Sequence, residues 1–348
     1  MKYIFFTFLT LIFLSLKSQN DTIKAFQEIN QEAEEAYNKG NAFYNEKNFT
    51  EAINSYNKCI EIKNDFESAY LNRGLCKVEI KDYKGALNDY DKAIELNSEN
   101  AKTYYLRGYA KLLLNDDNGS YSDLTKSINL NPTNSDSYYY RATLLIKKQD
   151  YNNALLDITK YINDNPNNAE ALNDRGSIYR MLEKYNEAIA DYKKAISLNQ
   201  KIAYIYNNLG SIYKKLEKYN EAILEYSKAI DIDGKNYLAY NNRGSAKFES
   251  NDYKGALDDF SSAVKLNPKY YYAFNNLGAV NHKLGNYDEA IKNYDIAIKL
   301  NSNYGHAYLN RGISKEMKRD KEGCIQDWEK ALSFGIKEAN GYLEKTRK

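Results

Sequence analysis

Few residues of this 348-residue chain have the type and spacing for acid–base or metal chemistry. Its histidines and cysteines are His282, His306, Cys59, Cys76 and Cys324. Two imidazoles without a carboxylate partner make a poor metal site, and three thiols cannot form a four-cysteine zinc site. No Ser/His/Asp set, phosphate-binding loop or pair of catalytic carboxylates falls at consistent helical positions. We therefore predict no catalytic residue, no metal and no cofactor.

Amide side chains, in contrast, recur at a regular spacing in the second half of the chain. An asparagine amide both donates and accepts hydrogen bonds, so it can bind the N–H and the C=O of a peptide group. Each bond contributes about 1 kcal/mol net, so several would be needed for micromolar binding. The alternative is that these amides bond to neighbouring helices or to solvent. The residues concerned are Asn173, Asn207, Asn208, Asn241, Asn242, Asn275, Asn276 and Asn310.

A fixed period of 34 residues organises the chain after residue 32. The prolines Pro132, Pro166 and Pro268 differ in position by 34 or a multiple of 34. Glycines share one phase of this period, with Ala142 in the only gap: Gly40, Gly74, Gly108, Gly176, Gly210, Gly244, Gly278 and Gly312. Nine units therefore fit residues 33–338 without insertion or deletion. They are 33–66, 67–100, 101–134, 135–168, 169–202, 203–236, 237–270, 271–304 and 305–338.

The pattern inside a unit predicts two helices. Residues 237–250 and 253–266 each carry apolar groups at three- and four-residue spacing, Asn251-Asp252 separates them, and Pro268 ends the second. A glycine on the first helix and an alanine on the second let the backbones approach closely. A hairpin this short cannot bury its apolar face alone, so successive units must stack. Cys59 and Cys76 would then lie on neighbouring helices, where a disulfide is conceivable in an oxidising compartment.

These residues resemble the consensus of the tetratricopeptide repeat family over 33–338. The resemblance implies an all-α fold, a right-handed α-solenoid superhelix whose first helices line a concave groove. It also implies binding of peptides or partner proteins rather than catalysis. The third unit departs from the consensus at Asp117, Ser120 and Leu124, which predicts looser packing there. The consensus is carried by Tyr240-Asn241-Asn242-Arg243-Gly244, then by Asp252 to Ala256, Phe260, Ala263 and Pro268.

By the same resemblance, the second, fifth, sixth, ninth and twelfth positions of a unit face the groove. The asparagines then resemble a ladder that holds a peptide backbone, as in some family members. We expect units 67–168 to contact apolar side chains instead. Lys39 and Lys102 are out of register with the family's carboxylate-binding set, so recognition of a C-terminal carboxylate is not expected. The apolar candidates are Leu71, Tyr105, Tyr109, Tyr139 and Tyr140.

An arginine recurs beside the glycine of most units, one position away from the groove-facing one. We predict that these side chains mainly form salt bridges to nearby aspartate or glutamate. The residues are Arg73, Arg107, Arg141, Arg175, Arg243 and Arg311.

Residues 1–19 have the pattern of a secretory signal peptide. Lys2 is followed by an apolar stretch over 3–16, which is shorter than the roughly 20 residues that a membrane-spanning helix needs. An uncleaved membrane anchor is the alternative. We expect an exported protein, periplasmic or secreted, with no stable membrane span after cleavage. Residues 20–32 are predicted to extend the first helix, and 339–348 to form a C-terminal capping segment.

Charge balance limits the classes of partner. Removal of Lys2 and Lys17 leaves 47 positive and 47 negative side chains, so attraction to nucleic acid is not expected. The sequence predicts a non-catalytic scaffold that binds an extended peptide or a partner protein in its concave groove. One alternative is a structural component of the cell envelope that acts through its convex surfaces. Another is an unrecognised enzyme or small-ligand binder.

Overall fold

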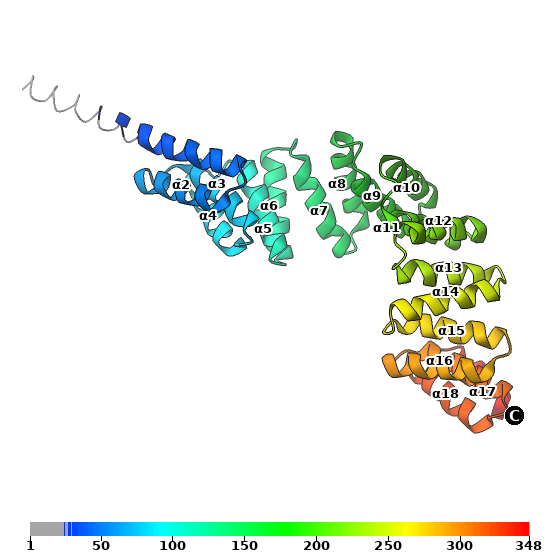
Figure 1. Ribbon diagram of the computed structural model, residues 1–348. Helices are drawn as coiled ribbons and strands as arrows, with labels where there is room; N and C mark the ends of the chain where they lie inside the picture. The colour runs from blue at the N-terminus through cyan, green and yellow to red at the C-terminus, as the bar shows by residue number, and fades with distance from the viewer. Residues whose placement is uncertain (1–23, 25–26, 29, 348) are drawn as a thin grey trace, which may run out of the picture. The chain divides into compact units, whose positions relative to one another are not determined.

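The computed structural model describes residues 24, 27–28 and 30–347. Regular structure in this range is helical throughout, without a strand, which confirms the all-α prediction (Figure 1). The predicted signal segment 1–19 lies outside the described residues. Residues 24, 27, 28 and 30–45 are helical, so the described residues of 20–32 are helical, and 30–32 belong to the first helix. No helix among the described residues is both long and apolar enough to cross a bilayer.

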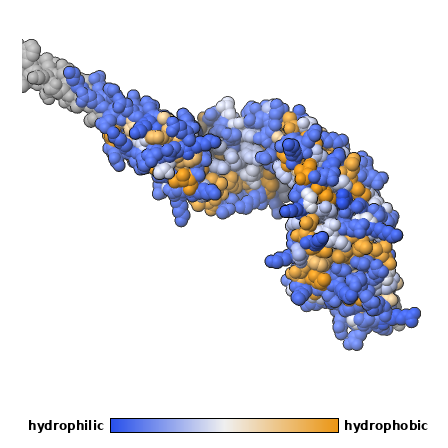
Figure 2. Space-filling view, viewed as in Figure 1, coloured by the Kyte–Doolittle hydropathy of each residue, from blue (hydrophilic) through white to orange (hydrophobic). Residues whose placement is uncertain are grey.

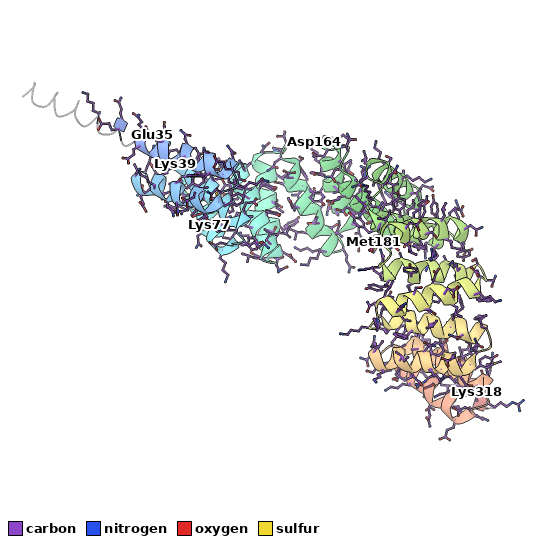
Figure 3. All side chains as sticks on the ribbon, in the orientation of Figure 1. Glu35, Lys39, Lys77, Asp164, Met181 and Lys318 are labelled. Atoms are coloured by element: carbon purple, nitrogen blue, oxygen red, sulfur yellow. The ribbon has the colours of Figure 1, made fainter. Side chains whose placement is uncertain are left out.

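The chain divides into two compact units, the first ending at Asn165 and the second beginning at Pro166. Charged side chains such as Lys39 and Lys318 lie at the helix surfaces (Figure 3). After the helix over 30–45, the first unit contains α2 (Phe49–Ile62), α3 (Glu67–Glu79), α4 (Tyr83–Leu96), α5 (Ala101–Leu113), α6 (Asp117–Leu130), α7 (Ser135–Lys147) and α8 (Tyr151–Asp164). The second contains α9 (Ala169–Met181), α10 (Tyr185–Leu198), α11 (Ala203–Lys215), α12 (Tyr219–Ile232), α13 (Tyr237–Glu249), α14 (Tyr253–Leu266), α15 (Tyr271–Lys283), α16 (Tyr287–Leu300), α17 (Gly305–Met317), α18 (Lys321–Ser333) and α19 (Ala339–Arg347).

Within each unit the helices stack as an α-solenoid. A helix packs against its neighbours in sequence, and the first helix of a repeat also contacts the first helix of the next, as α11 contacts α13 and α13 contacts α15. At the carboxyl end, α19 covers the last hairpin, where the Tyr342 ring stacks on Trp328 at 5.1 Å between centroids. The capping segment therefore buries apolar surface that the last repeat would otherwise expose.

The turn inside each described hairpin contains one residue with positive φ, and in five of the nine an aspartate follows that caps the second helix. Between α13 and α14, Asn251 has a φ of 65°, and the Asp252 carboxylate then accepts the backbone N–H of Gly255 at 2.9 Å. The left-handed residue reverses the chain and the carboxylate caps the second helix. The break predicted at Asn251-Asp252 is confirmed. The same position of the eighth repeat holds Gly285, the residue type best suited to positive φ.

In seven of the nine described hairpins an aromatic ring of the second helix packs on a glycine of the first. A Cβ added to Gly278 would lie 2.5 Å from a Tyr294 ring carbon, and one added to Gly210 would lie 2.8 Å from the Tyr226 ring. A ring of the second helix thus fills the space that a side chain at these glycines would need. In the third repeat a Cβ added to Gly108 would lie 3.1 Å from Leu124 Cγ, so this one position is less crowded, while looser packing of the whole repeat stays a prediction. The large side chains of this kind are Tyr56, Tyr90, Tyr192, Tyr226, Phe260, Tyr294 and Trp328.

The recurring arginines bind aspartates of the second helix in the same repeat. Arg175 donates from Nε and Nη2 to the two carboxylate oxygens of Asp191, at 2.7 and 2.8 Å. Two repeats carry leucine instead, and there the residue 16 positions later is Glu225 or Asn293 in place of aspartate. The salt-bridge prediction is confirmed. The remaining pairs are Arg73–Asp89, Arg107–Asp123, Arg141–Asp157, Arg243–Asp259 and Arg311–Asp327.

Candidate peptide-binding surface

The asparagines of the second unit bond to one another across successive repeats. The fifth residue of one first helix accepts a hydrogen bond from the sixth residue of the next first helix, 35 positions later. We call these contacts the asparagine pairs. They are Asn208 Nδ2 to Asn173 Oδ1 at 2.9 Å, Asn242 to Asn207 at 3.0 Å, Asn276 to Asn241 at 2.9 Å, and Asn310 to Asn275 at 3.0 Å.

Bonding between neighbouring helices is therefore one role of these amides. The acceptors Asn173, Asn241 and Asn275 are buried, so their contribution is to hold successive repeats in register. The sixth-position donors are only half-buried, and within the described chain their Oδ1 atoms have no hydrogen-bond donor. Asn276 also lines a cavity of about 110 Å³ with Ser245 and Phe248. Binding of a peptide backbone by the remaining amide groups stays a prediction.

The first unit has the same geometry with other side chains. At the equivalent positions Leu71 and Leu106 are buried in one apolar cluster, and the rings of Tyr105 and Tyr140 lie 6.1 Å apart. In these pairs polar residues face polar ones and apolar residues face apolar ones, whereas the first pair combines the two, with Asn72 Nδ2 donating to the Tyr37 hydroxyl at 2.9 Å. Leu71, expected on the groove surface, is only 5% exposed, because its partner Leu106 covers it. We leave Leu71 out of the candidate surface for this reason.

The structure brings the predicted tyrosines of the first unit together. The Tyr140 ring lies 4.9 Å from that of Tyr109 and 5.4 Å from that of Tyr139, and Tyr105 is the next ring. Burial, followed by the influence of Tyr109 and of the Asp136 charge, raises the pKa of Tyr140 to about 12. Burial also raises the pKa of Tyr105. Both hydroxyls therefore stay protonated at neutral pH.

A second set of exposed side chains in the second unit was not predicted. Tyr204, Leu238 and Tyr272 stand at the second position of successive first helices and are 45%, 40% and 43% exposed. His306 occupies the same position of α17 and is also exposed. We call these four residues the apolar row. Orange surface, which marks aliphatic and other hydrophobic residues rather than tyrosine or histidine, is also visible from α13 to α16 (Figure 2). The resemblance places the second position in the groove, but the predicted candidates in these repeats are the asparagines of the fifth and sixth positions.

The apolar row runs beside the asparagine pairs. Tyr204 precedes Asn207 and Asn208 by three and four residues, which places all three on one face of α11. The same spacing recurs on α13 and α15. Neighbouring rings support the row at its far end, where Tyr272 lies 5.3 Å from Tyr304, and Tyr304 5.8 Å from His306. At the equivalent positions the first unit has Ser68, Lys102 and Asp136, which are polar or charged.

The histidines and cysteines have structural contacts. His282 Nδ1 lies 2.9 Å from Ser314 Oγ, whereas His306 packs on Tyr304, and the described residues contain no cluster suited to a metal ion. Cys59 and Cys76 are buried free thiols, so the disulfide considered from the sequence is not formed. Burial raises the pKa of Cys59 to about 11 and that of Cys76 to about 12, which disfavours the reactive thiolate.

His282 makes stability depend on pH. Burial, and then the charge of Lys283, lowers the pKa of His282 in the folded protein. Its contribution to the free energy of unfolding is therefore complete above about 6.5, the ordinary histidine pKa, and is lost as pH falls through the lower folded value. We expect His282→Gln to reduce the stability difference between pH 7.5 and pH 5.5 in urea unfolding, with His306→Gln as control. An unchanged difference would contradict this assignment.

Comparisons with known proteins agree with this geometry. Residues 40–78, 77–115, 176–217, 210–249 and 244–285 match a family described as "TPR repeat", and 271–304, 124–155 and 158–190 match families described as "Tetratricopeptide repeat". A tetratricopeptide repeat protein from Parabacteroides merdae has 18% identity and a TM-score of 0.58, over 71% of this chain and 99% of that one. The APC/C hetero-tetramer Cut9-Hcn1 has 16% identity and a TM-score of 0.58, over 91% and 76%. Curated proteins gave no match.

Proposed function

This chain belongs to the tetratricopeptide repeat family, and we propose that its second unit binds an extended segment of a partner protein. The observation that carries the proposal is the apolar row, Tyr204, Leu238, Tyr272 and His306, exposed beside the asparagine pairs. Exposed aromatic and aliphatic side chains aligned over several helices are typical of protein-interaction surfaces. The protein is then a non-catalytic scaffold.

The spacing of the row suggests the conformation of the bound segment. First helices that contact each other directly lie about 8–10 Å apart. A polyproline II chain has three residues per turn and a rise of about 3.1 Å per residue, so one turn advances about 9 Å. Such a chain would present one side chain to each repeat. We therefore propose that the partner segment carries an apolar residue at every third position.

The asparagine pairs would add backbone contacts to this recognition. The half-buried Asn208, Asn242 and Asn276 each keep a carbonyl oxygen and one N–H that the pair contact does not use. Bonds from these groups to a bound peptide would contribute about 1 kcal/mol each. Side-chain contacts with the row would set specificity, and the amides would tolerate any sequence between the apolar residues.

One further point supports a scaffold, and a separate one bears on where the protein acts. A protein of the same fold, Cut9, is described as part of a hetero-tetramer with Hcn1, so this fold can serve in protein complexes. The pattern of residues 1–19 favours export, and we propose a periplasmic or secreted location on that basis. Detection of the mature protein in extracellular or periplasmic fractions would test the location separately from binding.

Substitution within the apolar row should weaken binding. We expect Tyr272→Ser, or Tyr204→Ser, to reduce affinity at least tenfold for a synthetic peptide with leucine at every third position, because each tyrosine supplies a large contact area. Fluorescence anisotropy with a labelled peptide measures this. Leu224→Ser is the matched control, since Leu224 is 55% exposed on α12, the other helix of the Tyr204 repeat.

The spacing of the probe peptide provides the second control. A peptide of the same composition with leucine at every second position should bind more weakly than the three-residue repeat. Equal loss of affinity in Leu224→Ser and Tyr272→Ser would contradict a role for the row. We avoid the combined alanine variant of Asn208, Asn242 and Asn276, because it also removes bonds between repeats and would confuse binding with stability.

A further inference from the structure

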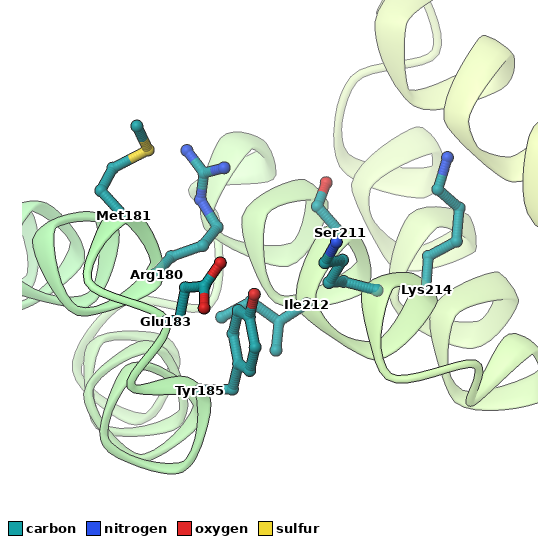
Figure 4. A pocket seen from close by; sticks show the side chains of 8 residues that line it. Arg180, Met181, Glu183, Tyr185, Ser211, Ile212 and Lys214 are labelled. Atoms are coloured by element: carbon teal, nitrogen blue, oxygen red, sulfur yellow. The ribbon is translucent and has the colours of Figure 1, made fainter.

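A pocket opens between consecutive first helices at the end opposite the apolar row. It has a volume of about 410 Å³ and lies near the carboxyl ends of α9 and α11, beside the start of α10 (Figure 4). This volume is ample for the end of a carboxylate side chain. The lining residues are Arg180, Met181, Glu183, Tyr185, Ser211, Ile212, Lys214 and Lys215.

The pocket carries an excess of positive charge. Arg180, Lys214 and Lys215 contribute three cations against the single carboxylate of Glu183. Ion pairs elsewhere in the described chain neutralise many arginines and lysines, but none of these three lies within 4.0 Å of a carboxylate. An anion inside the pocket would compensate charge that the protein itself leaves unbalanced.

Lys214 is the most informative of the three cations. Its side chain is half-buried, and Nζ donates a hydrogen bond to Ser245 Oγ at 3.0 Å, a neutral acceptor on α13. Burial lowers its pKa, and the charge of Glu249, which acts in the opposite direction without forming an ion pair, offsets only part of this effect. The carbonyl end of a helix favours cations, which accounts for lysines in the last turn of α11. It does not account for an ammonium held against α13.

We propose that this pocket binds the carboxylate of an acidic side chain in the partner segment, an inference that rests on the proposed function. The Arg180 guanidinium can donate two parallel hydrogen bonds to a carboxylate, and Lys214 supplies a second charge. Apolar walls from Met181 and Ile212 fit the methylene groups of glutamate.

Helix geometry places the acidic residue relative to the apolar stretch. Tyr204 and Lys214 are ten residues apart on α11, which corresponds to about 15 Å along the helix axis. An extended chain covers this distance in about five residues, at roughly 3.3 Å each. A partner segment that contacts both would therefore carry its acidic residue about five positions from the apolar residue that meets Tyr204.

Paired peptides test this inference. Both peptides have acetylated and amidated ends and leucine at every third position. They differ only at one residue, five positions beyond the last leucine of this series, which is glutamate in one peptide and glutamine in the other. We expect the glutamate peptide to bind the wild-type protein about tenfold more tightly at low salt, and the difference to shrink at high salt. Lys214→Met and Arg180→Gln should remove the difference. Lys283→Met, at the exposed position of α15 equivalent to Lys215, should retain it.

The outcomes separate this inference from the proposed function. If both peptides bind the wild type equally, the acidic subsite is wrong while the proposed function stands. If neither peptide binds the wild type, the proposed function and the acidic subsite are both wrong. Binding of inorganic phosphate in the pocket, with no higher affinity for the glutamate peptide than for the glutamine peptide, would identify a small-anion site and overturn the inference. Thermal unfolding of each variant checks that it folds. If Lys214→Met does not fold, Arg180→Gln still tests the inference, because Arg180 is exposed and its replacement should leave the fold intact.

Discussion

Replacement of Arg175 by leucine should lower the free energy of unfolding by about 3–5 kcal/mol, as expected when one partner of a buried ion pair is removed. The side chains of Arg175 and Asp191 are 17% and 9% exposed, and the contact uses both carboxylate oxygens. No lysine of this repeat binds Asp191, because Tyr179 stands where other repeats have lysine. Asp191 would be left buried with an uncompensated charge. Urea unfolding followed by circular dichroism measures the loss.

The chain supplies two controls for this prediction. Arg243→Leu should cost clearly less, because Lys247 Nζ remains 2.8 Å from Asp259. The double variant Arg175→Leu with Asp191→Asn should recover most of the loss, since it copies the natural pair Leu277 and Asn293, in which Asn293 donates to the Glu289 carbonyl at 2.7 Å. A loss of less than about 1 kcal/mol in Arg175→Leu, the range of a surface salt bridge, would show that the pair contributes little.

Replacement of Gly278 by alanine should destabilise the protein by about 1–3 kcal/mol, the usual cost of overpacking a core. The new methyl group would lie 2.5–2.8 Å from three atoms of the Tyr294 ring, which is fully buried and cannot move aside. Alanine is intrinsically the better helix former by about 1 kcal/mol, so the steric term must exceed this gain. The thermal midpoint of Gly278→Ala should therefore fall.

Gly108→Ala is the matched control. Its methyl group would lie 3.1 Å from Leu124 Cγ, and a leucine can adjust its rotamer more easily than a wedged ring. The fourth repeat already carries Ala142 at this position, above Ile158. We expect Gly108→Ala to be neutral or slightly stabilising. Similar losses in Gly108→Ala and Gly278→Ala would mean that ring packing does not explain the recurring glycine.

The repeat, its helices and its internal contacts could be predicted because they depend on residues within one period. The glycine and the ring that covers it are 16 residues apart, as are Arg175 and Asp191, and a hairpin with a fixed turn brings such positions together. The same reasoning located the break at Asn251-Asp252. Positions within a hairpin can be related by counting residues, since helix geometry and turn length are both set locally.

Contacts between repeats could not be derived in this way. Whether Asn208 faces Asn173 or a bound peptide depends on the angle at which one hairpin packs on the next, which no single repeat determines. Leu71 was misplaced for the same reason, because its cover, Leu106, comes from the following repeat. The basic pocket likewise depends on Arg180 and Lys214 meeting from consecutive repeats, with Lys214 held by Ser245 of a third.

The contact between the fifth residue of one repeat and the sixth residue of the next determines which repeats can be duplicated in tandem. A repeat with asparagine at both positions, such as 203–236, 237–270 or 271–304, is compatible with a copy of itself on either side. Tandem duplication of such a repeat preserves every amide bond at the junction. Repeat 67–100 has Leu71 and Asn72, so a duplicate would set leucine against asparagine. Lengthening by duplication is thus open to the carboxyl half, whereas shuffling repeats between halves would create mismatched junctions.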